Sequence, residues 1–205
     1  MESAFVNFER KEGVTGQRLD IHPTLSLPLN PGGYFEIKPS VGGRETLYLA
    51  ANNPPYDGYQ NRSLYDLNLD ITTTFVRIFA FEEGKDGLEK LKHTIRPKIV
   101  YTYIPEVNQD TLPQFDIVDN ISRRNDITYS LNTILTSKSM EGGKPLYRDY
   151  ISMDVSQSYG VDYEKYSINY TTGRLTGSDE KRHPFSDVTG EIKITPSAWT
   201  LMTGT

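Results

Sequence analysis

The apolar residues between Leu19 and Val41 fall almost entirely on odd-numbered positions, and this period of two constrains the fold most strongly. The odd positions carry Leu19, Ile21, Pro23, Leu25, Leu27, Leu29, Phe35, Ile37 and Val41. Such alternation is typical of a β-strand with one apolar face. Opposed residues in an antiparallel pair share a face, so an odd residue must oppose an odd residue. We therefore predict a connection with an odd number of residues, a three-residue loop with Gly32 or Gly33 in the left-handed conformation.

The same alternation recurs along the chain, and helical periodicity is absent. It is found in segments 63–79, 91–105, 125–138, 147–160 and 188–199, with a weaker first strand in 3–10. In 147–160 the apolar positions are Tyr147, Ile151, Met153 and Val155. These patterns predict an all-β fold, an antiparallel up-and-down meander of about eight strands, most of them longer than the usual five or six residues.

Composition excludes several classes of protein. A net charge of −5 with scattered lysines and arginines leaves no basic footprint for nucleic acid. The absence of cysteine excludes disulfides, thiolate metal sites and thiol catalysis. A mean hydropathy of −0.54 excludes helical membrane spans but not a transmembrane β-barrel, whose alternating strands average to a polar mean. The first residues, MESAFVNFERKEG, carry charges where a secretory signal has an apolar segment, so we expect an intracellular protein or an internal piece of a longer chain.

The predicted connections alternate in length. Short ones lie around 30–33, 82–90 and 138–145, whereas long ones lie around 50–62, 105–124 and 160–187. In a meander, alternate connections sit at opposite ends of the sheet, so one end is predicted to have tight turns and the other long loops. Outer-membrane barrels have this layout, with short periplasmic turns and long extracellular loops.

Three features favour a transmembrane barrel over a soluble sheet that packs on a core. The row from Leu19 to Leu29 spans 11 residues, which at about 3.3 Å each and a tilt near 45° rise about 25 Å, the height of a lipid-facing band. Several tyrosines fall near strand ends, where interfacial girdles lie: Tyr48, Tyr65, Tyr101, Tyr103 and Tyr159. No helix is predicted to cover the sheet. The lipid-facing candidates are Leu19, Ile21, Leu25, Leu27, Leu67, Leu69, Ile71, Ile99 and Leu131.

Prolines inside the predicted strands argue against a fully paired barrel, because proline has no N–H to donate to the ladder. Four of them, Pro23, Pro39, Pro97 and Pro196, are expected to mark bulges or strand ends.

No catalytic or metal-binding pattern stands out. The three histidines, His22, His93 and His183, share no ligand spacing. The row Asp66, Asn68 and Asp70 would form a line along a strand rather than a calcium cage. We therefore expect no enzyme activity, no catalytic or metal site and no cofactor.

Several stretches resemble the barrel domain of the LptD (OstA) family of lipopolysaccharide-assembly proteins of the outer membrane. They include TGQRLDIHPTLSLPL, YRDYISMDVSQSYG and, most specifically, LPQFD followed by NDITYSLNTILTSK. The resemblance spans nearly all of 1–205 and implies the middle portion of a very large barrel. The family's signal peptide, N-terminal jellyroll and terminal barrel strands, which flank the lateral opening, would lie outside it. The cysteines that join jellyroll and barrel in many members are absent.

The resemblance also implies a function and partners. The barrel inserts lipopolysaccharide (LPS) into the outer leaflet, the missing jellyroll connects it to the periplasmic Lpt bridge, and an LptE-like lipoprotein plugs the lumen. The even-numbered face would line that lumen, toward glycan or plug, through Arg18, Asp20, Lys38, Arg44, Asp66, Asp70 and Lys98. The loop at 105–124 would lie outside over the mouth, with Pro113, Phe115 and Asp116; a role in loop packing is the alternative.

Two other hypotheses stay open at this point. One is a different outer-membrane barrel, such as a porin or receptor, and the other is a soluble all-β binding module.

Overall fold

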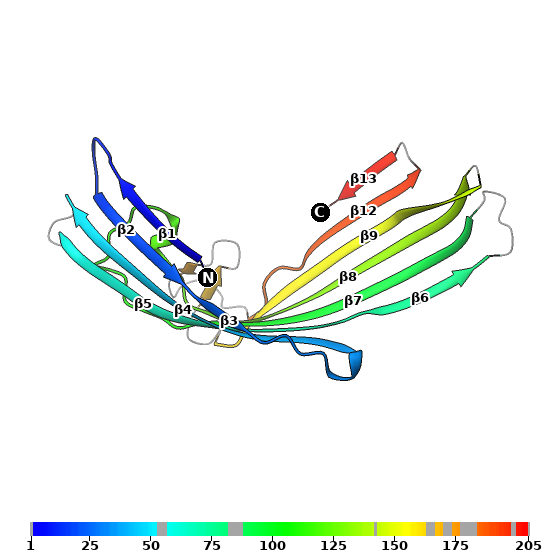
Figure 1. Ribbon diagram of the computed structural model, residues 1–205, viewed down its shortest axis with the longest axis horizontal. Helices are drawn as coiled ribbons and strands as arrows, with labels where there is room; N and C mark the ends of the chain where they lie inside the picture. Colours follow the sequence, from blue (N-terminus) through cyan, green and yellow to red (C-terminus); the bar gives the residue numbers. More distant parts are fainter. Residues whose placement is uncertain are drawn as a thin grey trace.

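The computed structural model describes residues 2–52, 57–81, 88–141, 143–162, 167–169, 174–176, 184–197 and 200–204. One antiparallel sheet forms most of it, bent into an open trough with consecutive strands side by side (Figure 1). Its strands are β1 (Glu2–Phe8), β2 (Thr15–His22), β3 (Thr24–Ser26), β4 (Phe35–Ala51), β5 (Gly58–Thr73), β6 (Phe75–Ala80), β7 (Leu88–Ile104), β8 (Arg124–Glu141), β9 (Lys144–Gly160), β12 (Thr189–Ser197) and β13 (Thr200–Gly204). The segments β10 (Ser167–Asn169) and β11 (Arg174–Thr176) pair separately.

The meander predicted from alternation is confirmed. β3 continues β2, and β6 continues β5, so the sheet is a run of long antiparallel strands in sequence order. Its last strand, β13, was not predicted, because five residues are too few for a clear alternation. Within the described residues, no helix is long and apolar enough to cross a membrane.

The first hairpin keeps one register from end to end. Thr15 opposes Ala51, Leu25 opposes Val41, and Leu29 forms a bridge with Ile37, so odd residues oppose odd residues throughout. The turn contains a 3₁₀ segment, and Gly32 and Gly33 both have positive φ, 63° and 73°. The odd-to-odd pairing and the left-handed conformation of the glycines were thus predicted correctly. The connection is longer than three residues, since 30–36 lie between the last bridged pair.

The prolines interrupt the ladder on one side only. Pro97 would face Thr73, and β5 ends there, whereas the pairing of Pro97 with Leu131 on the β8 side continues. A backbone N–H points to a single neighbouring strand, so its loss breaks one ladder and spares the other. Pro23 separates β2 from β3 in the same way. A register irregularity between Ile194 and Ser197 brackets Pro196. The expectation of bulges and strand ends is thus confirmed for Pro23, Pro97 and Pro196, whereas Pro39 lies inside β4 and keeps its pairing with Leu69.

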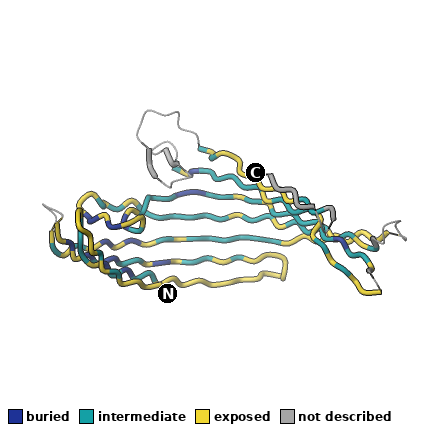
Figure 2. Tube along the Cα trace, turned by 90° about the horizontal axis from the view of Figure 1, so that it is seen from above, coloured by how far each residue is buried: buried dark blue, intermediate teal, exposed yellow. Residues whose placement is uncertain are grey.

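The two faces of the sheet differ in chemistry, as alternation requires. The odd-numbered face carries the nine predicted apolar residues, and many remain exposed: Leu25 is 74%, Leu27 59% and Ile99 49% exposed. Cross-strand pairing joins them into one surface, for example through Ile37, Ile71 and Ile99. The described residues supply no second layer over this face. Buried residues gather instead toward one end of the strands (Figure 2).

Two details of the predicted layout are wrong. The connection expected at 50–62 is much shorter, because β4 reaches Ala51 and β5 begins at Gly58. A bulge in the β8–β9 ladder shifts the partner of Thr136 to Asp149, after Leu135 has paired with Ile151. This shift turns Tyr147 onto the even-numbered face, opposite Lys138, and not onto the apolar face with Ile151. The connection 105–123 and the end of β9 at Gly160 lie at one end of the sheet, and the two-residue β8–β9 turn lies at the other. The connections expected at 82–90 and 160–187 lie largely outside the described residues.

The tyrosines near the strand ends divide between the faces. Tyr65 and Tyr103 pack together on the odd-numbered face, with ring centroids 6.0 Å apart, and Tyr101 opposes Leu69 on that face. Tyr48 is on the other face and only 1% exposed. Its assignment to an interfacial girdle is therefore wrong, because the β7–β8 connection covers it.

Candidate functional site

The seven charged residues predicted to share the even-numbered face do share it, but they fall into separate places. Arg18, Asp20 and Arg44 lie toward the end that is covered by the β7–β8 connection. Asp66 pairs with a neighbouring histidine near the middle of the strands. The remaining three, Lys38, Asp70 and Lys98, line an open hollow. We call the place that holds Arg18, Asp20 and Arg44 the covered end. We call the hollow lined by Lys38, Asp70 and Lys98 the central hollow.

An ionic network fixes the connection 105–123 to the covered end. Arg18 donates two hydrogen bonds to the Asp116 carboxylate, at 2.6 and 2.9 Å, and a third to Asp119, at 2.8 Å. Arg62 donates to the Asp119 carbonyl at 2.8 Å and to Gln109 at 2.9 Å. Arg18 is 4% exposed, and Asp119 is fully buried. Charge-assisted and bidentate bonds of this kind are the strongest that side chains make.

The connection is shaped by its own short 3₁₀ helix, η2 (Ile117–Asp119). The Asp116 carboxylate accepts from the Val118 N–H, and the Asp119 carboxylate accepts from the N–H groups of Phe115 and Asp116 at 2.7 and 2.8 Å. This capping box presents both carboxylates toward Arg18. Hydrogen bonds within the loop therefore orient the anionic side of the network.

Aromatic packing completes the covered end. The Phe115 ring stacks on Phe8, with centroids 4.3 Å apart, and lies 6.3 Å from Tyr48. Phe115 is 4% and Leu112 8% exposed, and Pro113 is fully buried. Phe8, Tyr48 and Arg18 belong to the even-numbered face, so the loop lies on that face of the sheet. Pro113, Phe115 and Asp116 thus pack against the sheet in this structure.

The Arg18 guanidinium, hydrogen-bonded to Asp116, holds the pKa of that carboxyl below its usual range. The hydrogen bond from Val118 and the positive charges of Arg18 and Arg10 act in the same direction, against partial burial. Asp116 therefore stays ionised at neutral pH, as the network requires.

Beneath the loop, a second cation and carboxylate, Arg44 and Asp20, form an ion pair within the sheet. Arg44 donates to the Asp20 carboxylate at 2.7 and 2.9 Å, and the Thr46 hydroxyl donates to it at 2.6 Å. Farther along the strands, His22 and Asp66 lie 2.6 Å apart. A Cβ on Gly42 would approach Asp66 Oδ1 to 2.3 Å, so the absence of a side chain there makes room for the pair.

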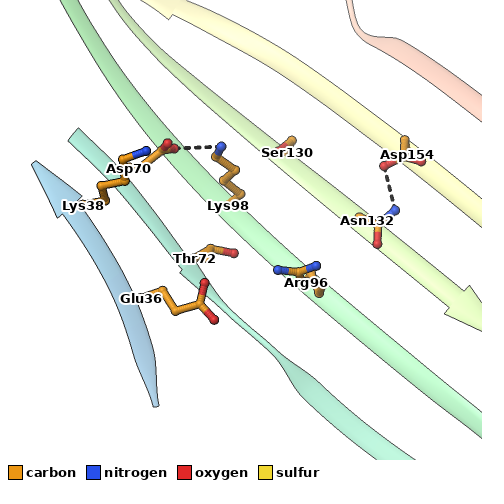
Figure 3. Close-up of a pocket in the computed structure, with 9 residues that line it drawn as sticks. All are labelled: Glu36, Lys38, Asp70, Thr72, Arg96, Lys98, Ser130, Asn132 and Asp154. Atoms are coloured by element: carbon orange, nitrogen blue, oxygen red, sulfur yellow. Dashed lines mark hydrogen bonds and ion pairs between the residues drawn. The ribbon is translucent and has the colours of Figure 1, made fainter. Parts of the chain in front are cut away.

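The central hollow is open and polar, with a volume of about 430 Å³ (Figure 3). Its lining comes from β4, β5, β7, β8 and β9: Glu36, Lys38, Asp70, Thr72, Arg96, Lys98, Ser130, Asn132 and Asp154. Lys98 and Asp70 form an ion pair at 2.8 Å, and the Asn132 amide donates to Asp154 at 2.8 Å. Three cations and three carboxylates balance one another in this lining.

Three charged side chains of the central hollow are not committed to protein partners. Within the described part of the chain, the structure records no hydrogen bond or ion pair for Glu36, Lys38 or Arg96. They surround hydroxyl and amide groups that donate and accept equally well. The arrangement suits a ligand with many hydroxyls and some charge, such as a glycan.

Sequence reasoning named three residues of the central hollow and missed the others. The missed residues, Glu36, Thr72, Arg96, Ser130, Asn132 and Asp154, all have even numbers, so parity alone could have included them. Arg62 and Asp119 of the covered end were missed as well. No group of three or more His, Asp or Glu in the described residues is placed to hold a metal ion.

Comparison with known proteins gives a consistent picture. The family model for LptD, LPS transport system D, matches residues 1–205. The LPS-assembly protein LptD of Methylococcus capsulatus is 36% identical over 104 residues, which cover 50% of this chain and 10% of that protein. The protein of the same name from Xanthomonas campestris pv. campestris is 28% identical over 195 residues, covering 85% of this chain and 23% of that protein.

A third relative, the LPS-assembly protein LptD of Nitrosococcus oceani, is 37% identical over 102 residues, covering 49% of this chain and 13% of that protein. The chain thus spans less than a quarter of the length of these relatives. With a family match over its whole length and the two-faced antiparallel sheet that a barrel wall requires, the chain belongs to the LptD family.

Proposed function

We propose that this chain forms part of the wall of an outer-membrane β-barrel that assembles LPS into the outer leaflet. The observation that carries the proposal is the sheet with one exposed apolar face and one charged face, in a chain whose relatives are named LPS-assembly proteins. In this proposal residues 1–205 are one portion of a larger barrel domain.

The odd-numbered face would contact lipid. Soluble monomers rarely expose a contiguous apolar surface of more than a few hundred Å², and this face joins apolar residues from many adjacent strands. The β4 strand, Phe35–Ala51, has 17 residues, so at about 3.3 Å per residue and a 45° tilt it rises about 40 Å. That length crosses the hydrocarbon region and leaves strand ends beyond it.

The even-numbered face would line a hydrated lumen, through which the glycan of LPS passes. Of its seven predicted residues, Lys38, Arg44, Asp66, Asp70 and Lys98 would contribute directly, whereas Arg18 and Asp20 are buried beneath the connection 105–123. The balanced charges and hydroxyls of the central hollow support a glycan path, because a single-sign ion filter would concentrate one charge. The further partners we propose are an LptE-like plug lipoprotein in the lumen and the periplasmic Lpt bridge.

Site-specific photo-crosslinking in cells tests this assignment. A photoreactive p-benzoyl-phenylalanine is placed at Asn132, in the central hollow, or at its neighbour Leu131, on the apolar face. Radiolabelled LPS glycan should crosslink at position 132 and not at position 131. Absence of LPS adducts at position 132, in cells that assemble LPS normally, would contradict the proposal.

A further inference from the structure

One hydrogen-bonding edge of β6 has no neighbouring strand among the described residues. The pairing of β4 with β5 ends at Phe35 and Thr73, whereas β6 continues beyond that point and pairs only with β7. The hairpin of β3 and β4 turns away from β6 there (Figure 1). A hollow of about 350 Å³ lies in the fork, between the hairpin turn and residues 73–75. Because β4 and β7 lie on either side of β5 and its continuation β6, this edge is inside the sheet and is not one of its outer borders.

The register shows which backbone groups face the open edge. The Phe81 N–H donates to the Glu89 carbonyl at 3.0 Å, in the same register that joins β6 to β7. Hydrogen-bonded and non-hydrogen-bonded pairs alternate in an antiparallel ladder, so the odd residues of β6 bond to β7 and the even residues point away from it. The backbone groups that face the open edge therefore belong to Val76, Ile78 and Ala80. Within the described part of the chain, no backbone hydrogen bond is recorded for them on that side.

This edge lacks the features that usually protect a free strand. Native proteins protect free edges with prolines, charged side chains or bulges. The β6 sequence, FVRIFA, has no proline and one charged residue, Arg77, and all six residues are exposed. An exposed edge built from Phe, Val and Ile is a template for a further strand.

The side chains on the two faces beside the edge favour one kind of added strand. On the odd-numbered face, Phe75 and Phe79 are 59% and 38% exposed. On the even-numbered face, Lys92 opposes Ile78 and Lys90 opposes the small Ala80. Among the described residues, the structure records no hydrogen bond or ion pair for the side chains of these two lysines. The complementary strand is therefore apolar on one face and acidic on the other.

The lysines are close enough to take part. A strand added to β6 would lie two strand spacings, about 10 Å, from β7. Extended lysine and glutamate side chains together span that distance, and Ala80 leaves space above β6 for them to meet. No residue of β6 is acidic, so nothing on that strand competes for the lysines.

We propose that the free edge of β6 is a docking site for an extended acidic segment of a partner protein, which adds a strand to the sheet. The backbone of the segment bonds to Val76, Ile78 and Ala80. Its carboxylates face Lys90 and Lys92, and its apolar side chains continue the odd-numbered face. Strand addition to an exposed sheet edge is a recurring mode of peptide recognition.

The edge lies at the end of the sheet that has the two-residue β8–β9 turn. In the orientation proposed above this end is periplasmic, so the partner is a periplasmic protein. The compartment rests on the proposed function, whereas the strand addition itself does not.

Binding of defined peptides to the full-length protein in detergent micelles tests the inference. The probe is a short blocked peptide of alternating valine and glutamate, labelled for fluorescence anisotropy. The wild type should bind it at least about tenfold more tightly than its valine–lysine counterpart, because charge-assisted contacts contribute about this factor. The valine–glutamate peptide with every backbone nitrogen methylated should not bind detectably, since it cannot donate to the edge. Equal binding of the probe and either control peptide would overturn the proposal.

Variants locate the site. In Ile78→Pro the lost N–H is one that points away from β7, so the β6–β7 ladder keeps its bonds while the edge loses a donor. Affinity for the probe should fall at least about tenfold. K90Q/K92Q should remove the preference for glutamate over lysine, whereas the matched control K144Q, at the same end of the sheet but on the odd-numbered face, should keep it. Thermal unfolding of each variant reports whether the barrel remains folded.

Amide hydrogen exchange identifies the occupant of the edge. In the full-length protein alone, Val76, Ile78 and Ala80 should exchange faster than Arg77 and Phe79, and the probe should slow them. Slow exchange at the even positions without the probe would show that another segment of the same protein covers the edge. A wild-type dimer that Ile78→Pro converts to a monomer would show that a second copy covers it. Either result would overturn the proposal.

The outcomes separate this inference from the proposed function. If the probe binds as expected but LPS does not crosslink at position 132, the proposed function fails and the docking edge stands. If LPS crosslinks at position 132 but neither Ile78→Pro nor K90Q/K92Q changes binding of the probe, the docking edge fails and the proposed function stands.

Discussion

The covered end and the central hollow occupy the same face of the same strands, yet they use charge in opposite ways. At the covered end each cation has fixed anionic or carbonyl partners: Arg18 binds Asp116 and Asp119, and Arg62 binds loop carbonyls. In the central hollow Lys38 and Arg96 remain open to a ligand. The residue types are the same, so sequence composition does not distinguish a structural network from a binding surface.

What distinguishes them is the connection 105–123. Where it docks, it removes water and supplies Phe115, Leu112 and two carboxylates, so charges become buried and their pairing becomes a condition of stability. Where it does not reach, the charges stay hydrated and their pairing contributes little. The comparison predicts large effects of substitution at the covered end and small effects in the central hollow.

The largest effect is expected for Asp119→Ala. It removes the buried acceptor of Arg18 and of two loop N–H groups, and loss of one partner from a buried pair costs about 3–5 kcal/mol. Urea unfolding of the full-length protein in bilayer vesicles measures this change in the free energy of unfolding. The control, Asp154→Ala, lies in the exposed central hollow and should cost at most about 1 kcal/mol. A loss at Asp154 as large as that at Asp119 would remove the distinction between the regions.

A comparable contrast should separate the two faces of one strand. Leu69→Arg places a charge on the proposed lipid face and should cost about 2–4 kcal/mol near the bilayer midplane, while the adjacent Asp70→Asn should be nearly neutral. Bilayer refolding of the full-length protein gives both values. Equal costs at the two positions would refute the proposed orientation.

A smaller effect is expected at Gly42. Its added methyl group in Gly42→Ala would lie 2.3 Å from Asp66 Oδ1 and 2.6 Å from His22 Nε2, so the pair must separate. We expect a cost of about 1–3 kcal/mol, typical of overpacking. Gly43→Ala is the matched control, since a Cβ there meets nothing within 4 Å. Unfolding free energies that fall equally in both variants would show that glycine flexibility, not space, matters here.

The smallest effect concerns pH. Because Arg18 depresses the pKa of Asp116, the ion pair stabilises the docked loop fully above the ordinary carboxyl pKa, about 4, and is lost as pH falls through the lower folded value. Amide-exchange protection factors in 105–123 should therefore be level from pH 7 to 5 and decrease below pH 4. In Asp116→Asn this acid step should shrink, and protection that increases on acidification would contradict the assignment.

The alternation was enough to predict the meander, the odd-to-odd pairing of the first hairpin and most of the faces. Between Leu19 and Ile37 a shift of one residue would place charged side chains in the apolar row, and the structure keeps odd residues opposite odd residues. The length of the turn was not predicted correctly. The prolines indicated where the hydrogen-bond ladder is interrupted, because proline has no backbone N–H to donate. The family match confirmed the resemblance on which the functional expectations rested.

The covered end could not be predicted in the same way. Arg18 and Asp116 are 98 positions apart, and alternation carries no information on which loop folds back onto which strand. The predicted face of Tyr147 was wrong for a different reason. The extra residue of the bulge is Tyr150 in β9, because Leu135 pairs with Ile151 and Thr136 with Asp149. It reverses the alternation toward Tyr147, and nothing in the local composition of 147–160 signals it.

The distance along the chain between the partners at the covered end sets an order for folding. Neighbouring strands pair through local hairpins, whereas the Arg18–Asp116 contact closes a segment of 98 positions and gains nothing until β2, β4, β5 and β7 are aligned. The entropic cost of bringing these distant positions together comes before such contacts can stabilise the fold. We therefore expect the ionic network to form late, after this section of the wall has reached its final register.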